Sequence, residues 1–195
     1  MKKLVFILLV LSQVCLLYSQ EKENIDLLVT EDSWRKEAFR FPMLFAQEVN
    51  FDGVADVRFT KGWEDKNSPN FWSYAFAWKI SIDQPLSELD IENYMQLYFD
   101  GLMNVVKKDK SQVLPATLAL FSSLEIPGST IYKGKISFHD AFFTEEMMIL
   151  NVQCHYTYCS DQDISVYKFK LSPKPLDSTV WQHINKVMLR SDICE

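Results

Sequence analysis

The segment FWSYAFAWKI, residues 71–80, decides the fold, because large rings alternate in it with small side chains. Successive side chains of a β-strand point to opposite faces of a sheet. One face of this strand therefore carries Trp72, Tyr74, Phe76, Trp78 and Ile80. The other face carries Ser73, Ala75 and Ala77. Because small residues let a helix approach closely, we expect a central strand that is covered on both sides.

A helix is expected after this strand, from Glu88 to Val106. Ser87 is a candidate N-cap, and Asp90 stands three residues later, where its side chain can complete a capping box. Apolar residues recur through the segment at helical spacing: Ile91, Tyr94, Met95, Tyr98, Leu102, Val105 and Val106. We expect this apolar stripe to cover the face of strand 71–80 that carries the small residues.

The remaining segments predict further strands and one more helix. Earlier strands are expected at 39–45 and 54–59, with Asp52-Gly53 as the turn between them. An antiparallel meander is expected at 117–125, 132–143, 147–158 and 164–171, followed by a closing helix at 178–190. The sequence therefore predicts an α+β fold, with an antiparallel sheet of about six or seven strands packed against helices 88–106 and 178–190.

The N-terminus has the pattern of a secretory signal peptide. Lys2 and Lys3 precede an apolar run from Leu4 to Leu17, and Tyr18-Ser19-Gln20 is a plausible cleavage site. We therefore expect residues 1–19 to be removed, 20–33 to form a mobile lead and 34–195 to form a single domain. The protein is then exported, to the periplasm or to the outside of the cell.

The charge of the chain bears on the partners to expect. Removing residues 1–19 takes away two lysines and no acidic residue, so the net charge changes from -6 to -8. An acidic molecule repels phosphate backbones and anionic lipid. We therefore expect no nucleic acid as a partner and no membrane insertion after cleavage.

Three cysteines remain after cleavage, and the register of the last hairpin separates two of them. If residues 160–163 form the turn, Cys154 stands opposite Phe169 and points into the core, whereas Cys159 lies at the mouth of the hairpin and points away. Residues on opposite faces of one strand are badly placed to bond. We therefore predict a disulfide between Cys159 and Cys194, worth about 3 to 4 kcal/mol, and a buried thiol at Cys154.

No metal or cofactor site is predicted. A short turn after strand 132–143 would place His139 opposite Asn151, four residues and about 13 Å from His155, which is too far for one zinc ion. Both histidines are expected on the outward, solvent-facing side. The sequence also contains no G-x-S-x-G, phosphate-binding glycine loop, HExxH or CxxC motif.

The aromatic face of strand 71–80 leaves two interpretations open. The rings could form the floor of a groove for an envelope glycan, lipid or protein, with Trp63, Trp72, Tyr74 and Trp78 as the ligand-binding residues. Alternatively, the closing helix packs on these rings through Trp181 and the face is simply core. We favour the packed core, because an aromatic stripe at strand spacing usually lies inside a protein.

Four segments resemble an uncharacterised family of exported bacterial proteins: FPMLFA (41–46), GVADVRFTKGW (53–63), FWSYAFAWKI (71–80) and KLSPKPLDSTVWQHI (170–184). The resemblance spans nearly the whole mature chain but implies no activity. The order of elements is also similar to that of the PsbP-like fold of photosystem extrinsic proteins, a likeness of layout alone.

Two classes of function follow as hypotheses. The first is a non-catalytic binding or accessory protein of the bacterial cell envelope, since no nucleophile, base or metal set is recognisable. The second is a hydrolase of envelope material that uses the carboxylates of Asp140, Glu145 and Glu146 near one hairpin. A pair of carboxylates about 5 to 9 Å apart in a cleft would favour the hydrolase.

Overall fold

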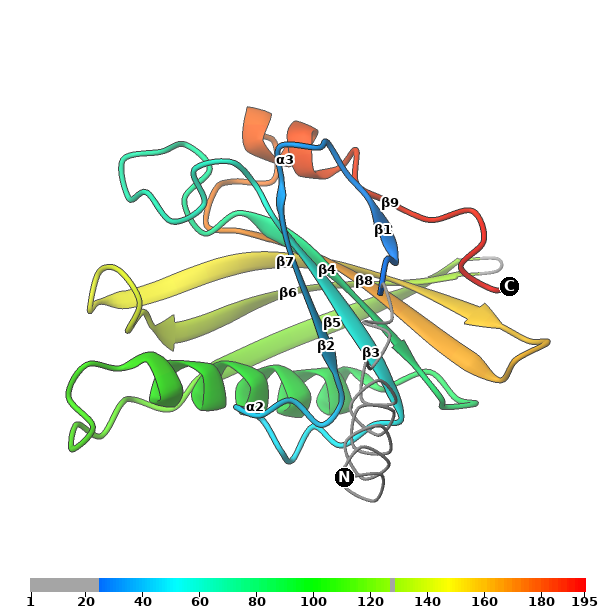
Figure 1. The fold of residues 1–195 in the computed structure, drawn as a ribbon, viewed down its shortest axis with the longest axis horizontal. Coiled ribbons are helices and arrows are strands. Elements are labelled where there is room, and N and C mark those ends of the chain that lie inside the picture. Colours follow the sequence, from blue (N-terminus) through cyan, green and yellow to red (C-terminus); the bar gives the residue numbers. More distant parts are fainter. Residues whose placement is uncertain (1–24, 127–128) are drawn as a thin grey trace, which may run out of the picture.

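The chain forms a seven-stranded antiparallel sheet in the computed structural model, which describes residues 25–126 and 129–195 (Figure 1). The strands follow the order β2-β3-β4-β8-β7-β6-β5 across the sheet. They are β2 (Arg35–Arg40), β3 (Gly53–Phe59), β4 (Tyr74–Ile80), β5 (Leu118–Ile126), β6 (Ser129–His139), β7 (Met147–Cys159) and β8 (Ile164–Ser172). The antiparallel sheet is thus confirmed, while the expected signal peptide, 1–19, lies outside the described residues.

Helix α2 (Glu88–Val106) has the predicted bounds and the predicted capping box between Ser87 and Asp90. It covers the face of β4 that carries the rings: the Tyr98 ring is stacked on the Phe76 ring with 6.0 Å between centroids. The prediction that this helix covers the face of small residues is therefore wrong. Four antiparallel steps separate β4 from β5, so the two strands are parallel and α2 is the crossover between them. The right-handed preference of such crossovers ties the helix to one face.

The face of β4 with small residues is covered by the C-terminal and N-terminal segments instead. Ala75 and Ala77 are fully buried against Trp181 of α3 (Thr179–Ile184). The predicted helix 178–190 is too long, since the chain leaves α3 at residue 184 and Met188–Leu189 forms β9. That strand pairs with β1 (Leu28–Val29) in a second, two-stranded sheet. In Figure 1, α3, β1 and β9 lie on the opposite side of the main sheet from α2.

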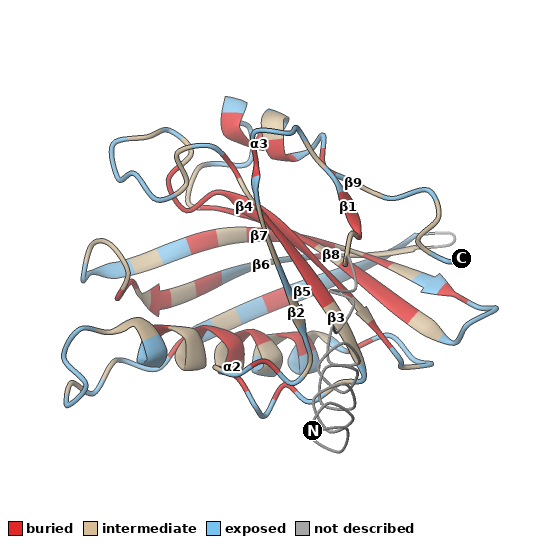
Figure 2. Cartoon of the chain, in the orientation of Figure 1, coloured by how far each residue is buried: buried red, intermediate tan, exposed pale blue. Residues whose placement is uncertain are grey.

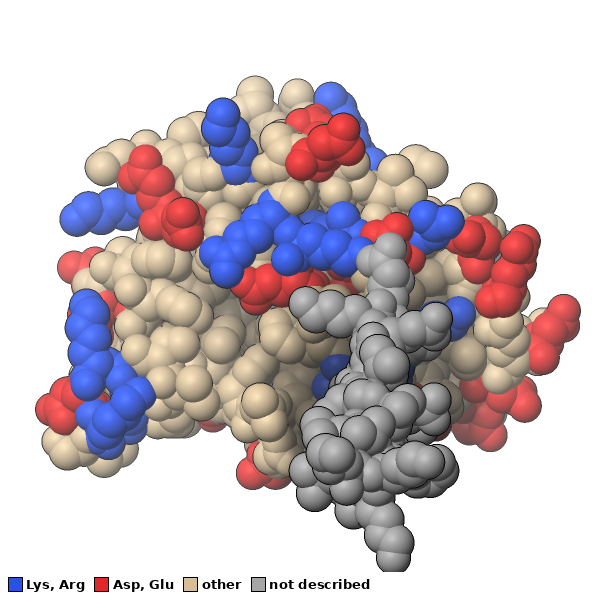
Figure 3. Space-filling model, in the orientation of Figure 1, with Lys and Arg blue, Asp and Glu red and all other residues tan. Residues whose placement is uncertain are grey.

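The N-terminal segment is attached to the sheet by a buried carboxylate on β3. Asp56 accepts hydrogen bonds from the backbone N–H groups of Leu27 and Leu28, at 2.8 and 3.1 Å. Its other bonds come from the guanidinium of Arg58, which also pairs with Asp26. Figure 3 shows basic side chains gathered across this view, with acidic side chains beside them. Residues 25–33, expected as a mobile lead, therefore pack on the sheet.

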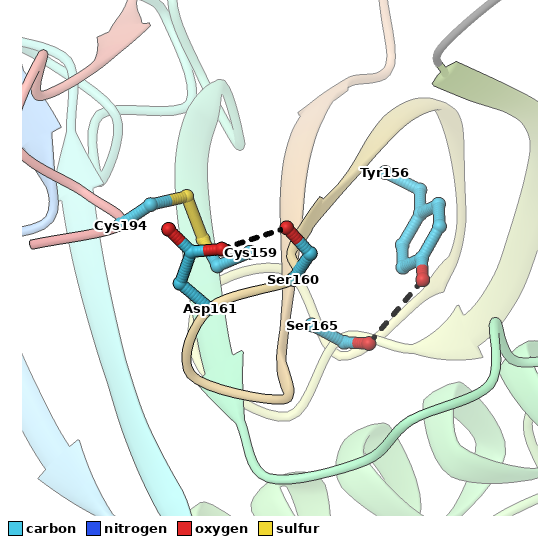
Figure 4. Close-up of a disulfide and its surroundings, with 6 residues drawn as sticks. All are labelled: Tyr156, Cys159, Ser160, Asp161, Ser165 and Cys194. Carbon is cyan, nitrogen blue, oxygen red and sulfur yellow. Dashed lines mark hydrogen bonds between the residues drawn. A yellow bond between two sulfur atoms is a disulfide. The ribbon is translucent and has the colours of Figure 1, made fainter.

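The C-terminus is attached by the predicted disulfide between Cys159 and Cys194 (Figure 4). The two residues are 35 positions apart in the sequence and their Cα atoms lie 5.2 Å apart. Cys154 is a buried free cysteine opposite Phe169, as the predicted register requires. The disulfide pairing and the register of the β7–β8 hairpin are both confirmed.

The β6–β7 hairpin differs from its prediction. Asn151 pairs with Lys135, and His139 pairs with Met147, so the expected pairing of His139 with Asn151 is wrong. The connection is a seven-residue loop, 140–146, rather than a short turn. The fully buried Asp140 carboxylate organises this loop by accepting the backbone N–H groups of residues 142, 143 and 144 and the Thr144 hydroxyl.

The first long strand also differs from its prediction. β2 covers Arg35–Arg40, whereas the strand was expected at 39–45. Pro42 stands two residues after the end of β2, and proline cannot donate to a strand ladder. Residues 41–52 therefore form a long connection to β3 that crosses over to α2, where Phe45 packs edge-on against Tyr98 with 5.1 Å between ring centroids.

Candidate functional site

A cavity of about 260 Å³ lies at one end of the layer between α2 and strands β2 and β3. We call it the aromatic cavity, because side chains with rings dominate its wall. The sheet contributes Phe59 and Tyr74, the helix contributes Tyr98, and the two loops at this end contribute Trp63, Phe142 and Phe143. Figure 2 shows that buried residues concentrate in the neighbouring strands β3, β4 and β8.

Trp63 is held in place between β3 and the loop 140–146. Its ring stacks on Phe59, with centroids 4.2 Å apart and planes at 29°. On the other side it meets Phe143 edge-on, with centroids 5.4 Å apart and planes at 79°. Trp63 is only partly buried, so its indole closes the cavity while it keeps contact with solvent.

The four candidate ligand-binding residues of the sequence divide into two groups. Trp63, Trp72 and Tyr74 all line the aromatic cavity. Trp78 lies deeper, fully buried, and its ring is packed edge-on against Phe41, with 5.6 Å between centroids. The aromatic stripe is therefore partly core, as the favoured interpretation expected, and its first two rings reach a hollow. The expected cover by Trp181 is wrong, since that side chain packs on the opposite face.

Tyr74 and Tyr98 bring unpaired hydroxyls to the inner wall, and Trp72 brings a buried indole N–H that has no hydrogen-bond partner within the described residues. Among the described residues, neither the Tyr74 nor the Tyr98 hydroxyl has a hydrogen-bond partner, and both side chains line the cavity. Burial raises the pKa of Tyr98 above its ordinary value, with a smaller contribution from Glu37. Burial, with the nearby Tyr98, raises the pKa of Tyr74 as well. Both phenols therefore stay protonated and can each donate one hydrogen bond.

The rim of the aromatic cavity carries charges of both signs. Arg35 forms an ion pair with Glu37 at 2.5 Å and approaches Glu64 to 4.0 Å. All three side chains line the cavity and are solvent-accessible. Opposite charges at this spacing cancel much of each other's field, so the entrance favours neither a strong cation nor a strong anion.

The three carboxylates that the hydrolase hypothesis named do not form an open acid–base pair. Asp140 is fully buried, and its oxygens are occupied by the loop 140–146. Glu145 pairs with Lys108 at 3.1 Å and lies 3.7 Å from the Nε2 atom of His139, while Glu146 is exposed. The His139 side chain is only 13% exposed, which corrects its expected place at the surface.

Sequence reasoning missed the ring residues that complete the cavity wall. Phe142 and Phe143 were assigned to a strand, and Tyr98 was assigned to a helix on the other face. The pattern Asp140-Ala-Phe-Phe-Thr144 held a clue, because an aspartate followed by a threonine four residues later favours a side-chain-capped turn over a strand.

Within residues 25–126 and 129–195, no helix is long and apolar enough to cross a bilayer. The same described ranges contain no group of three or more His, Cys, Asp or Glu side chains that could hold a metal ion. The functional assignment therefore depends on the geometry of the aromatic cavity itself. Comparison with protein-family models, with curated proteins and with solved structures gives no match for the chain.

Proposed function

We propose that this protein binds a small, mostly apolar ligand in the aromatic cavity, as a non-catalytic binding or accessory protein of the bacterial cell envelope. One observation carries the proposal: strands, helix α2 and three separate loops converge on a hollow of about 260 Å³ instead of filling it. Protein interiors are normally close-packed, with few voids larger than a water molecule. A hollow lined by rings and open to solvent is the usual form of a small-molecule site.

The wall of the cavity defines the chemistry of the ligand. Rings surround the hollow and bind apolar surface or the face of another ring. The hydroxyls of Tyr74 and Tyr98 supply two donors, so the ligand should present an acceptor oxygen, as a carbonyl, ether or hydroxyl group. The volume is slightly below the range of about 300 to 1,000 Å³ typical of drug-sized ligands, which favours one ring system or a short acyl group over an oligomer.

Two further parts of the proposal concern location and architecture. Export is supported by the N-terminal sequence pattern and is consistent with the Cys159–Cys194 disulfide, since disulfides persist mainly in oxidising compartments. A PsbP-like layout is supported by the antiparallel sheet with α2 on one face and α3 on the other. Neither argument identifies the ligand.

The test uses 1-naphthylamine, a dye with one ring system whose emission shifts to shorter wavelength on burial, together with a matched pair of helix variants. Leu102→Phe places a larger side chain in the cavity wall of α2. Leu89→Phe makes the same change on the same helix at an exposed position outside the cavity. We expect Leu102→Phe to weaken dye binding by roughly tenfold or more, about 1.4 kcal/mol, and Leu89→Phe to leave it unchanged.

A second pair of variants tests the proposed donors. Tyr98→Phe should weaken binding of a ligand with an acceptor oxygen, such as a naphthyl ketone, and leave binding of naphthalene itself unchanged. Near-ultraviolet circular dichroism checks that each variant keeps its packed aromatic core. Equal dye affinity in Leu102→Phe, Leu89→Phe and the unmodified protein would show that the aromatic cavity is not the binding site.

A further inference from the structure

One part of the sheet is covered on a single side only. We call it the outer face: the surface of β5, β6 and β7 that points away from α2. The alternate residues of these strands, such as Phe121, Ile136 and Leu150, point to the α2 side and are buried there. Segments α3, β1 and β9 cover β4 at Ala75 and Ala77. No described segment covers the outer face in the same way.

Large apolar side chains are exposed along the outer face. On β5, Leu118 and Leu120 are 68% and 73% exposed, and Leu124 is 58% exposed. On β7, Met147 and Ile149 are also exposed. Ile149 stands in one cross-strand row with Leu118 of β5, because Ser137 of β6 pairs with both residues. A groove of about 460 Å³ crosses this surface. Leu120, Lys135 and Leu176 are among the residues that line it.

The outer face is also basic, although the chain as a whole is acidic. Lys133 and Lys135 of β6 are exposed, and neither ammonium has an ion pair among the described residues. Lys168 and Lys170 of β8 lie beyond this face, because their ammonium groups are bonded to residues 185–187 of the covering segment. No outward strand position of β5, β6 or β7 within the described ranges carries Asp or Glu. Burial and the nearby lysines 170, 168 and 133 lower the pKa of His155 in the middle of this surface.

We propose that the outer face docks on an anionic lipid bilayer. Exposed leucines can enter the boundary between headgroups and acyl chains while lysines beside them reach the lipid phosphates. Each lysine near an anionic surface strengthens attachment. Leu120 and Lys135 are direct cross-strand partners, so one docking orientation satisfies both. This inference is independent of the ligand proposed for the aromatic cavity, which lies on the other side of the sheet.

Charge argues against the two other occupants. A second copy of this chain, docked through the same face, would bring two basic patches together, because a two-fold interface pairs one patch, here with Lys133 and Lys135, with its own copy. A polyanion without apolar parts would leave Leu118, Leu120 and Leu124 in water. The net charge of -6 describes the whole chain, whereas docking depends on the local surface.

The test is vesicle co-sedimentation of the protein in the form recovered from an exporting culture. Vesicles of phosphatidylglycerol and phosphatidylcholine are compared with vesicles of phosphatidylcholine alone. We expect at least tenfold stronger partitioning onto the anionic vesicles, and a loss of most of that difference between about 0.1 M and about 1 M salt, where the Debye length falls from about 10 to about 3 Å. Equal partitioning onto both vesicles, or onto neither, overturns the proposal.

Charge variants assign the effect to the outer face. Lys133→Glu combined with Lys135→Glu should reduce partitioning onto anionic vesicles by roughly tenfold or more. Lys61→Glu combined with Lys66→Glu makes the same change of net charge at exposed positions in another loop, and should have a much smaller effect. If the glutamate pair does not fold, Lys133→Gln with Lys135→Gln replaces it. Equal losses in both pairs would mean that net charge alone acts, which overturns the assignment.

Apolar variants separate a bilayer from other partners. Leu120→Ser with Leu124→Ser should reduce partitioning severalfold, whereas Leu44→Ser with Val113→Ser, at even more exposed positions elsewhere, should not. Light scattering measures the oligomeric state of the same samples. A concentration-dependent dimer that disappears in Leu120→Ser with Leu124→Ser would assign the outer face to self-association and would also overturn the proposal.

Discussion

The two faces of the sheet are buried in different ways. On the α2 side, large rings such as Phe76 and Trp78 fill a thick layer, and the hollow at its end is the aromatic cavity. On the opposite side, Ala75 and Ala77 let Trp181 approach β4 closely, and this cover ends before β5. The comparison teaches that side-chain size sets how near a covering layer lies, while the extent of that layer decides which residues stay exposed.

The largest expected change in the free energy of unfolding comes from a buried ring on the α2 side of the sheet, and it is compared with the change from an exposed leucine of the outer face. Trp78→Ala removes a fully buried indole and should lower the free energy of unfolding by about 3 to 5 kcal/mol. Leu120→Ala removes an exposed side chain and should change it by no more than about 0.5 kcal/mol. Urea unfolding followed by circular dichroism measures both. A large loss in Leu120→Ala would mean that the outer face is covered in solution.

The next effect concerns how the C-terminus is held beside the β7–β8 hairpin. Cys159→Ser combined with Cys194→Ser opens the disulfide and should lower the free energy of unfolding by about 3 to 4 kcal/mol in the chain-entropy account. Reductant added to the unmodified protein should produce a similar loss, because Cys154 is already a free thiol. If neither treatment changes the urea midpoint, the non-covalent contacts of α3 and β9 alone retain the C-terminus.

The smallest effect tests a lysine that the cover by α3 partly buries. Burial, with a smaller contribution from Lys168, lowers the pKa of Lys170 to about 8. The unfolded chain keeps its proton up to about pH 10.4, so between about pH 8 and pH 10 it binds more protons than the folded protein. The contribution of Lys170 to the free energy of unfolding should therefore rise with pH in this window, by on the order of 1 kcal/mol after allowance for solvent screening. The buried Cys154 thiol, whose pKa is raised by burial, contributes in the opposite direction.

Lys170→Met tests this pH dependence directly. The variant has no titrating group at position 170, so the free energy of unfolding of the unmodified protein should rise relative to that of the variant between about pH 8 and pH 10. Urea unfolding at several pH values measures the difference. Above about pH 10 the comparison ends, because the buried tyrosines, including Tyr98, keep their protons in the fold and lose them in the unfolded chain. Parallel curves for both proteins would contradict the shifted pKa of Lys170.

Local patterns predicted the elements that are long and periodic. The bounds of α2 and its capping box are confirmed, since both depend on residues within one turn of Ser87. The β7–β8 register is confirmed because the core-facing residues of both strands alternate without a break, and a shift by one residue would turn Cys154 and Phe169 to the wrong face. The disulfide prediction followed from that register.

Elements that depend on distant partners were predicted poorly. The second helix ends at residue 184 because β1, from the other end of the chain, offers a strand edge to Met188. The strand 132–143 ends at His139 because the Asp140 carboxylate captures three backbone N–H groups of the following loop. The pairing with β1 and the hydrogen bonds of Asp140 both end an element early, and neither can be recognised from the periodicity of the segment itself.

The sequence by itself determined which side chains share a face in β4 and α2, because the period of two in 74–80 and the helical period in 88–106 are properties of consecutive residues. The predicted strand 71–80 began too early, since residues 71–73 belong to the preceding loop. Only the tertiary structure decided which helix covers which face of β4, since the sense of a crossover depends on where the sheet continues. The same is true of the aromatic cavity, whose wall joins Trp63, Tyr98 and Phe143 from segments far apart in the chain. Contacts of this kind arise from packing in three dimensions, and periodicity within one segment carries no information about them.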